Sequence, residues 1–259
     1  MSTFLFDKII FGPVRSRRLG VSLGINLLPV DSKVCSFDCI YCECGLNPEK
    51  REKKAELPSR QKVFEHLDAK LRSMIEEGMP PDVITFAGNG EPTLHPEFAG
   101  IIDDTILLRD KYCKEARIAV LSNASRIGND DVFNALLKVD DNIQKLDSGI
   151  EETILKLDRP NYKFSLKKTV DELIRFNGKV IVQTMFVKGS FNGVDVDNTK
   201  EEDIVPWLEL LKKIGPSSVM IYTIERDTPF DTLSKVPLEQ LNEIAGRVNA
   251  IGLKTQVSG

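Results

Sequence analysis

Short runs of β-branched and other apolar residues alternate with longer stretches of helical periodicity along most of the chain. Runs of the first kind are typical of buried strands, and stretches of the second kind are typical of amphipathic helices. The pattern predicts six strands, over Val21–Leu28, Val83–Ala87, Arg117–Leu121, Asn142–Leu146, Lys179–Val187 and Ser218–Ile224. It predicts helices over Ser59–Glu77, Pro96–Lys111, Asp130–Lys138, Ser165–Phe176, Glu201–Ile214 and Leu238–Ile251, with Asn129 and Thr199 as N-caps. This alternation indicates βα units around a parallel sheet.

The 259 residues contain no repeat, low-complexity tract or linker that would separate a second domain. We therefore expect a single domain over residues 1–259, with a core over about 10–225 and a C-terminal helix and tail over 236–259. Six βα units are fewer than the eight of a closed TIM barrel. The expected fold is α/β, an open, partial (β/α)6 TIM-like barrel with a parallel sheet and with its chemistry at the carboxyl ends of the strands.

The composition is that of an ordinary globular protein, with 41% hydrophobic and 29% charged residues. No apolar run reaches the ~18 residues that span a bilayer, and the first residues lack a secretory signal, so we expect a cytoplasmic protein without a membrane partner. The net charge of −4 does not indicate nucleic-acid binding. Residues 1–64, however, carry eleven basic and seven acidic side chains, and this part of the chain is where a polyanion would bind.

Four of the five cysteines, Cys35, Cys39, Cys42 and Cys44, lie within ten positions. Clustered cysteines in a reducing compartment bind metal or carry out redox chemistry more often than they form disulfides. The first three follow the first strand in one loop, where their thiols can turn toward one centre. A four-iron cluster with three thiolates keeps one iron open for a chelating molecule. A zinc knuckle is the alternative, although structural zinc needs four ligands; Cys44 and Cys113 are expected not to bind metal.

The segment CSFDCIYC over residues 35–42 resembles the CxxxCxxC signature of the radical S-adenosylmethionine (SAM) superfamily, including the aromatic residue before the third cysteine. The resemblance implies that Cys35, Cys39 and Cys42 hold a [4Fe–4S] cluster and that SAM chelates its fourth iron. It implies reductive cleavage of SAM to methionine and a 5′-deoxyadenosyl radical, which abstracts hydrogen from a substrate. Tyr41 would then pack near the adenine. A reductant protein such as flavodoxin or ferredoxin is the implied partner.

The second predicted strand ends in Gly88, Asn89, Gly90 and Glu91 before a proline, which resembles the GGEP motif of the same superfamily. Glycines let the backbone approach a ligand closely, and the resemblance implies that Glu91 accepts a hydrogen bond from the SAM ammonium group. An ordinary glycine-rich turn is the alternative.

Polar residues also stand at the ends of the later strands. Ser122 and Asn123 are similar to a TNG-like segment of the superfamily. Lys145 suits the methionyl carboxylate of SAM, and Asp147 or Ser148 suits the ribose hydroxyls. A simple lysine–aspartate surface pair, worth ~0–1 kcal/mol, is the alternative for this strand end. Further positions correspond to those where the superfamily contacts adenine or substrate: Gln183, Thr184, Met185, Tyr222 and Thr223.

The flank over residues 12–24 is similar to segments of the wybutosine-type tRNA-modifying enzymes, although no cysteine before Cys35 could hold a second cluster. Two basic groups could border the mouth of the barrel: Arg15, Arg17 and Arg18, and Lys50, Arg51, Lys53 and Lys54. A metabolite, a peptide and a tRNA all remain open as the substrate. The leading hypothesis is a radical SAM enzyme, and the alternative is a non-catalytic Fe–S electron carrier or metallochaperone.

Overall fold

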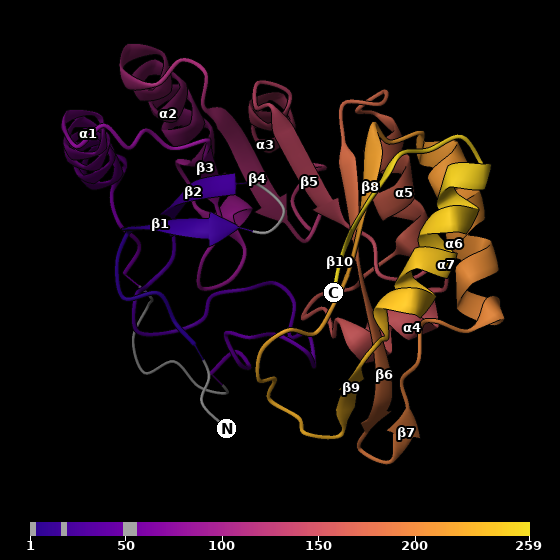
Figure 1. The fold of residues 1–259 in the computed structure, drawn as a ribbon. Helices are drawn as coiled ribbons and strands as arrows, with labels where there is room; N and C mark the ends of the chain where they lie inside the picture. Colours follow the sequence, from indigo (N-terminus) through magenta and orange to yellow (C-terminus); the bar gives the residue numbers. More distant parts are fainter. Residues whose placement is uncertain (1–3, 17–19, 49–55) are drawn as a thin grey trace.

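A mostly parallel, curved sheet forms the centre of the molecule (Figure 1). The computed structural model of the chain describes residues 4–16, 20–48 and 56–259. Within these ranges the strand order is β1-β2-β3-β4-β5-β6-β8-β10, and β7 and β9 pair with β6. The strands are β1 (Ile10–Ser16), β2 (Gly20–Ile25), β3 (Val83–Phe86), β4 (Arg117–Ser122), β5 (Asp141–Lys145), β6 (Ile181–Phe191), β7 (Val194–Asp195), β8 (Ser218–Thr223), β9 (Leu233–Lys235) and β10 (Thr255–Ser258).

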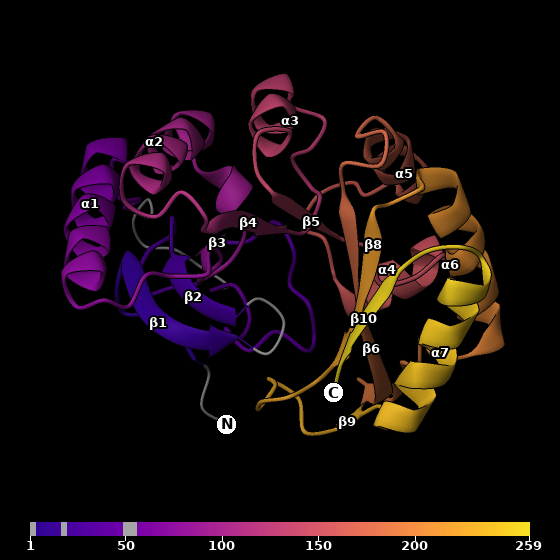
Figure 2. The same ribbon diagram turned by 45° about the horizontal axis from the view of Figure 1, so that its top comes forward.

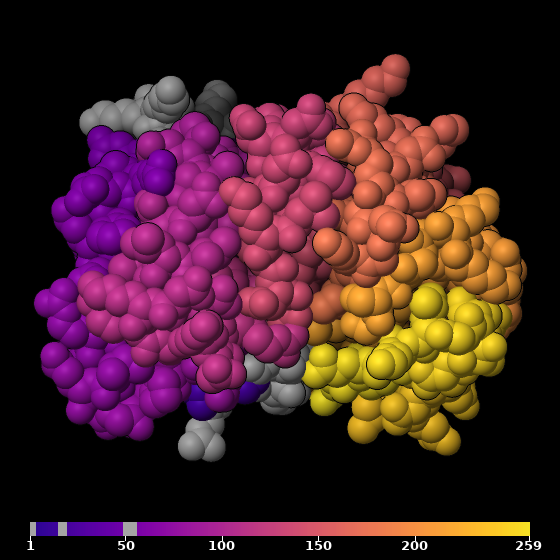
Figure 3. Space-filling view, turned by 90° about the horizontal axis from the view of Figure 1, so that it is seen from above, coloured from indigo at the N-terminus to yellow at the C-terminus, as the bar shows by residue number. Residues whose placement is uncertain are grey.

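Helices cover the outer, convex face of this sheet, and loops lie on its inner side (Figure 2). They are α1 (Arg60–Glu76), the short η1 (Pro92–Leu94), α2 (Phe98–Tyr112), α3 (Asp130–Leu136), α4 (Glu151–Leu157), α5 (Leu166–Ile174), α6 (Glu201–Ile214) and α7 (Leu238–Ala250). Strands β2, β3, β4, β5, β6, β8 and β10 pair in parallel in chain order. The expected open, partial barrel is therefore confirmed, and in Figure 3 the colours pass across the molecule in chain order.

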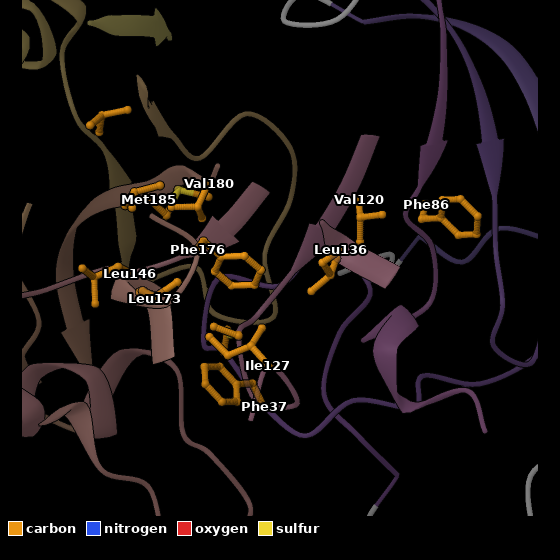
Figure 4. Packing of buried hydrophobic residues seen from close by; sticks show 14 of the residues in the cluster. Phe37, Phe86, Val120, Ile127, Leu136, Leu146, Leu173, Phe176, Val180 and Met185 are labelled. Carbon is orange, nitrogen blue, oxygen red and sulfur yellow. The ribbon is translucent and has the colours of Figure 1, made fainter. Parts of the chain in front are cut away.

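The core lies on both faces of the sheet because side chains alternate along each strand. In β4, Ile118 and Val120 belong to the large cluster that the helices cover, whereas Ala119 belongs to a small cluster with Ile143 and Met220. Each fully buried aliphatic or aromatic side chain contributes roughly 1.5–3 kcal/mol. Figure 4 shows the larger cluster, in which Phe37 of the cysteine loop belongs to the same core as Ile127 and Phe176.

The structure contains elements that the sequence pattern does not predict. Strand β1 pairs antiparallel with β2, and β10 adds a further parallel strand beyond β8. A glycine and a proline interrupt the β1 sequence, and β10 is only four residues long and half-buried, so neither has a clear period-two signal. Helix α4 is seven residues long, about two turns, which is short for detection by periodicity. Among the described ranges, no helix combines the length and apolar character needed to cross a bilayer.

One of the two expected helix caps is wrong. Asn129 caps α3, because its side chain accepts hydrogen bonds from the backbone N–H groups of Asp131 and Val132. Thr199 does not cap α6, whose N-cap position is Lys200. The Thr199 hydroxyl instead donates to the Asp197 carboxylate at 2.6 Å. A local side-chain bond thus competes with capping, as is common for threonine before a helix.

Candidate functional site

The loop that carries the cysteines follows β2 and is tied by its backbone to the loop after β3. Val34 N donates to Asn89 O at 2.8 Å, and Glu91 N donates to Val34 O at 3.1 Å. Gly90 lies between these two bonds with a φ of +134°, and a Cβ at Gly90 would lie 1.9 Å from Val34 O. Only glycine permits this approach. The motif that resembles GGEP therefore holds the residue directly before Cys35.

A second set of backbone bonds holds the other side of the cysteine loop. Ile40 N donates to Leu157 O at 2.9 Å, and Asp38 N donates to Asp158 O at 2.9 Å. Asn161 N donates to Ser36 O, also at 2.9 Å. The partners belong to the end of α4 and to the segment after it. The cysteine loop thus lies between two segments that are far from it in the sequence.

The three predicted ligands are free thiols in this loop: Cys39 is buried, and Cys35 and Cys42 are half-buried. Lys33 is 3% exposed, and its ammonium group donates to Gly45 O at 2.8 Å. Burial alone would lower the pKa of Lys33, but the nearby thiols of Cys42, Cys35 and Cys39 raise it above its usual value. One buried cation therefore lies within electrostatic reach of all three thiols.

The thiols differ in their tendency to ionise. Burial, together with the charge of Glu91, raises the pKa of Cys35 to about 12, and burial also raises the pKa of Cys39. The neighbouring Cys44 and the charge of Lys33 lower the pKa of Cys42 to about 6. Cys42 is thus the most acidic of the three thiols, and the Cys44 thiol beside it donates to Gly88 O at 3.5 Å.

The donor set fits an iron–sulfur cluster in its chemistry. Cysteine thiolates are the ligands of [4Fe–4S] clusters, and each of the three would bind a different iron. A single zinc ion needs four ligands within about 2.3 Å of one centre. Among the residues that the structure describes, no group of three cysteine, histidine or acidic side chains is placed to hold one metal ion. Asn123 Nδ2 donates to Cys35 Sγ at 3.4 Å, a contact typical of the surroundings of cluster sulfurs.

Tyr41, Lys145, Asp147 and Asp158 form a buried hydrogen-bonded group, here called the Tyr41 network. The Tyr41 hydroxyl lies within hydrogen-bonding distance of Asp158 Oδ1, at 2.8 Å, and of Asp147, and its one proton can be donated to either carboxyl group. Lys145 Nζ donates to Asp147 Oδ2 at 2.9 Å and to the Tyr41 oxygen. The side chains of Lys145 and Asp147 are 15% and 0% exposed. The alternative of a surface pair is therefore wrong.

The Tyr41 network borders the second cysteine. Burial raises the pKa of Asp158 to about 7, and the charge of Asp158 in turn raises the pKa of Cys39. Burial alone would lower the pKa of Lys145, but Asp147 and Asp158 raise it well above its usual value. Lys145 is thus a fixed cation between two carboxyl groups. Tyr222 contributes to the same electrostatic environment from β8.

Glu91 joins the end of β4 to the loop after β3. Its carboxylate is 1% exposed and accepts bonds from Thr93 N at 3.1 Å and Thr93 Oγ1 at 2.5 Å. The other oxygen accepts from Asn123 N at 2.6 Å, and Ser122 also donates to the carboxylate. Burial raises the pKa of Glu91. The structure thus gives Glu91 a scaffold role, and its bond to the SAM ammonium group stays a prediction.

The remaining residues of the glycine-rich loop also organise the backbone. The Asn89 side chain is fully buried and bonds with the backbone of Phe6 and Pro29. Gly88 has a φ of +149°, and a Cβ there would lie 2.4 Å from Asn26 Oδ1. Contacts of Gly88 and Asn89 with the cofactor remain predictions.

Three residues predicted at the strand ends have partners inside the chain. The Ser148 hydroxyl donates to Asp203 at 2.6 Å, and the Thr184 hydroxyl donates to Leu146 O at 2.7 Å. Met185 N donates to Asp147 Oδ1 at 2.9 Å, which connects β6 to the Tyr41 network. The structure brings Met185, but not Ser148 or Thr184, into contact with that network. Their roles toward SAM stay predictions.

Sequence reasoning missed two residues of the site, Lys33 and Asp158. Neither belongs to a motif, since a lone lysine before a cysteine and an aspartate after a short helix are common in any chain. Their burial against the cysteines could be found only in three dimensions. The predicted basic groups at Arg17, Arg18, Lys50, Arg51, Lys53 and Lys54 lie outside the described residues, as does the side chain of Arg15.

A partial barrel with three cysteines in the loop after its first parallel strand defines a class of enzyme. A family model described as the Radical SAM superfamily matches residues 30–201, and the chain belongs to that superfamily. The chemistry of these enzymes depends on SAM and a [4Fe–4S] cluster, and both are cofactors of this chain.

The chain is similar to several uncharacterised proteins. It is 32% identical over 253 residues to UPF0026 protein MJ1312 of Methanocaldococcus jannaschii. The aligned region covers 96% of this chain and 74% of that protein. It is 29% identical to a UPF0026 protein of Helicobacter pylori J99, which covers 86% of this chain and 68% of the relative. Neither printed name specifies a substrate or a reaction.

Solved structures share the fold. A radical SAM methyltransferase from Sphaerobacter thermophilus superposes with a TM-score of 0.66 at 15% identity, covering 92% of this chain and 65% of that chain. TYW1 with a lysine–pyruvate adduct superposes with a TM-score of 0.65 at 13% identity, covering 88% of this chain and 73% of that chain. At these identities the likeness concerns the fold alone.

Proposed function

We propose that this chain is a radical SAM enzyme in which Cys35, Cys39 and Cys42 hold one [4Fe–4S] cluster. The bound cluster and SAM would supply the chemistry, reductive cleavage of SAM followed by hydrogen abstraction from a substrate. The observation that carries the proposal is the position of the three thiols. They lie in one loop, after the first parallel strand, held by backbone bonds on both sides.

The residues around this loop supply binding and orientation. Lys33 offsets the negative charge of the thiolates, and Asn123 donates to Cys35 Sγ. Lys145 lies at the carboxyl end of β5 and is paired with Asp147 and Asp158, and it would bind the methionyl carboxylate of SAM by exchanging one of these partners. The Lys145 ammonium group lies over the Tyr41 ring, 4.7 Å from its centroid, and packing of Tyr41 near the adenine of SAM stays a prediction.

The cluster assignment is tested by anaerobic reconstitution of the full chain with iron and sulfide. Replacing Cys35, Cys39 or Cys42 by alanine should abolish the broad visible absorbance and lower the iron content from about four per chain. Cys113→Ala is the matched control, because Cys113 is a half-buried thiol outside the loop. Equal loss of iron in the Cys44→Ala or Cys113→Ala variant would contradict the three-ligand assignment.

The enzymatic part is tested on the same material. Reduction with dithionite in the presence of SAM should release 5′-deoxyadenosine and methionine, and the cysteine variants should release neither. A protein that binds four irons, accepts an electron and leaves SAM intact would instead be an electron carrier. That result would refute the proposed enzymatic activity and would support the cluster assignment.

The substrate is open among a metabolite, a peptide and a tRNA. Neighbours of the same fold include TYW1 and SuiB bound to a precursor peptide, so the fold serves different substrates. We expect that fractionated cell extract added to reduced protein and SAM will accelerate 5′-deoxyadenosine release in one fraction. Sensitivity of that fraction to ribonuclease or to protease separates the tRNA and peptide substrates from a metabolite.

A further inference from the structure

A polar hollow of about 420 Å³ opens between the loop after β4 and the start of α5. Arg126 lines one side of it, and Lys163 and Lys168 line the other. All three are exposed, and in the described part of the chain none has a carboxylate within ion-pair distance. Glu172, the carboxylate in the lining, is paired with Arg175. The hollow therefore carries a net positive charge on a chain whose total charge is −4.

Both walls of this basic hollow are bonded to the cysteine loop. On one side, the Ser125 hydroxyl lies 2.6 Å from the Ser36 hydroxyl. On the other side, Asn161 Nδ2 donates to Cys35 O at 3.1 Å. Ser125 lines the hollow, and Asn161 directly precedes the lining residue Tyr162. The first proposed cluster ligand thus lies directly behind the hollow.

Aromatic side chains fill the space between the hollow and the cysteines. Tyr162 is 40% exposed, and its ring centroid lies 6.2 Å from that of Phe37. Phe37 is 2% exposed and stands between Cys35 and Cys39 in the sequence, and Phe164 packs against it at 6.1 Å. These ring contacts connect the lining of the hollow to the cysteine loop.

We propose that the basic hollow is the docking surface for an acidic, low-potential electron carrier of the flavodoxin class. This inference rests on the proposed cluster. Electron transfer weakens steeply with distance, so the donor must dock close to the cysteine loop. The net charge of −4 disfavours an acidic partner, whereas the three cations of the hollow, which have no ion-pair partner among the described residues, attract it. One electron passes from the flavin hydroquinone, which becomes the semiquinone, to the oxidised cluster, and no bond is made or broken.

The test is the rate of cluster reduction, measured without SAM by anaerobic stopped-flow absorbance with a fully reduced bacterial flavodoxin. The Lys163→Glu, Lys168→Glu double variant should be reduced at least about tenfold more slowly at low ionic strength, because steering changes association rates by 10–10³-fold. The difference should narrow at about 1 M salt, where the Debye length is about 3 Å. Reduction by dithionite, a small reagent, should stay within about twofold of the parent.

A matched control makes the same change of charge elsewhere. Lys114 and Lys213 are exposed and have no ion-pair partner among the described residues. The Lys114→Glu, Lys213→Glu double variant should keep the parental rate with flavodoxin. Calorimetric titration of the iron-free chain with oxidised flavodoxin gives a second readout that needs no cluster. Binding there should weaken about tenfold in the Lys163→Glu, Lys168→Glu variant only.

Two results would overturn the proposal. One is a flavodoxin rate that is the same for the hollow variant and the control variant. The other is an unchanged flavodoxin rate together with loss of tRNA or inorganic phosphate binding, which would make the hollow a site for an anionic substrate. If the parent chain binds no iron, the cluster assignment fails and electron transfer through the hollow fails with it, whereas an iron-loaded parent chain whose flavodoxin rate ignores the hollow refutes the docking surface alone.

Discussion

Gly90 is the position at which one added methyl group should separate the cysteine loop from the glycine-rich loop. In a Gly90→Ala variant the new Cβ would meet Val34 O at 1.9 Å and Val34 C at 2.5 Å. Both contacts are with backbone, so they cannot be relieved by a side-chain rotation. The chain must open the bridge between Val34 and Gly90, and two backbone hydrogen bonds go with it.

The size of the effect follows from these losses. A non-glycine residue in such a conformation costs about 1–3 kcal/mol, and each lost hydrogen bond costs about 1 kcal/mol. The Gly90→Ala variant should therefore lose about 3–5 kcal/mol of unfolding free energy. Gly78→Ala is the matched control, because Gly78 has a φ of +69° but nothing within 4 Å of its added Cβ. That variant should lose only about 1–2 kcal/mol.

Thermal unfolding of the iron-free chain, followed by circular dichroism, measures the difference. The Gly90→Ala variant should lose about 2–3 kcal/mol more unfolding free energy than the Gly78→Ala variant, which corresponds to a Tm about 4–12 °C lower. Iron content after reconstitution should fall in Gly90→Ala and stay at the parental level in Gly78→Ala. Equal Tm values and equal iron contents in the two variants would refute the idea that the bridge positions Cys35.

Three further predictions concern the charges around the cysteines. Lys33→Met should lower the reduction potential of the reconstituted cluster, because it removes a buried positive charge near the thiolates and leaves its partner Asp38 unpaired; an unchanged potential in a redox titration would contradict the role of Lys33. In the iron-free chain at pH 7, iodoacetamide should label Cys42 before Cys35, as mass spectrometry would show. When the labelling is repeated over a range of pH, the labelling rate of Cys42 should rise up to about pH 7 and then level off. Glu91→Gln should weaken SAM binding by ~1.5–3 kcal/mol in calorimetry and should also lower the Tm without SAM, since an amide replaces an acceptor of bonds from Thr93 and Asn123.

The barrel could be predicted because each βα unit carries its own local signal. The apolar run over residues 83–87 matches β3, and Glu201–Ile214 matches α6 residue for residue. The strand ends were less certain, since β2 stops at Ile25 and β6 continues to Phe191. Beyond Val187, β6 is extended by antiparallel pairing with β7 and β9, and that pairing has no periodic signal in the β6 sequence.

The candidate site could be predicted only as far as its motifs reach. The spacing of the cysteines indicates the chemistry, and the alternation of Lys145 and Asp147 indicates that they share one side of a strand. Nothing local reveals that Asp158 completes their network, because it comes from the end of a short helix. Likewise, the sequence shows a carboxylate at Glu91. It does not show that the carboxylate oxygens already accept hydrogen bonds from Thr93 and Asn123.

The position of the cysteines depends on contacts that their spacing does not contain. The loop over residues 34–41 has little regular structure and is held by the glycine-rich loop on one side and by residues 157–161 on the other. The Tyr41 network then connects the second cysteine to the ends of β5 and β6. Any change that displaces α4 should therefore alter the position of the cysteine loop and the position of the Lys145 ammonium group. The proposed iron-binding part and the proposed SAM-binding part of the site therefore share one set of buried contacts, through Tyr41, Lys145 and Asp147.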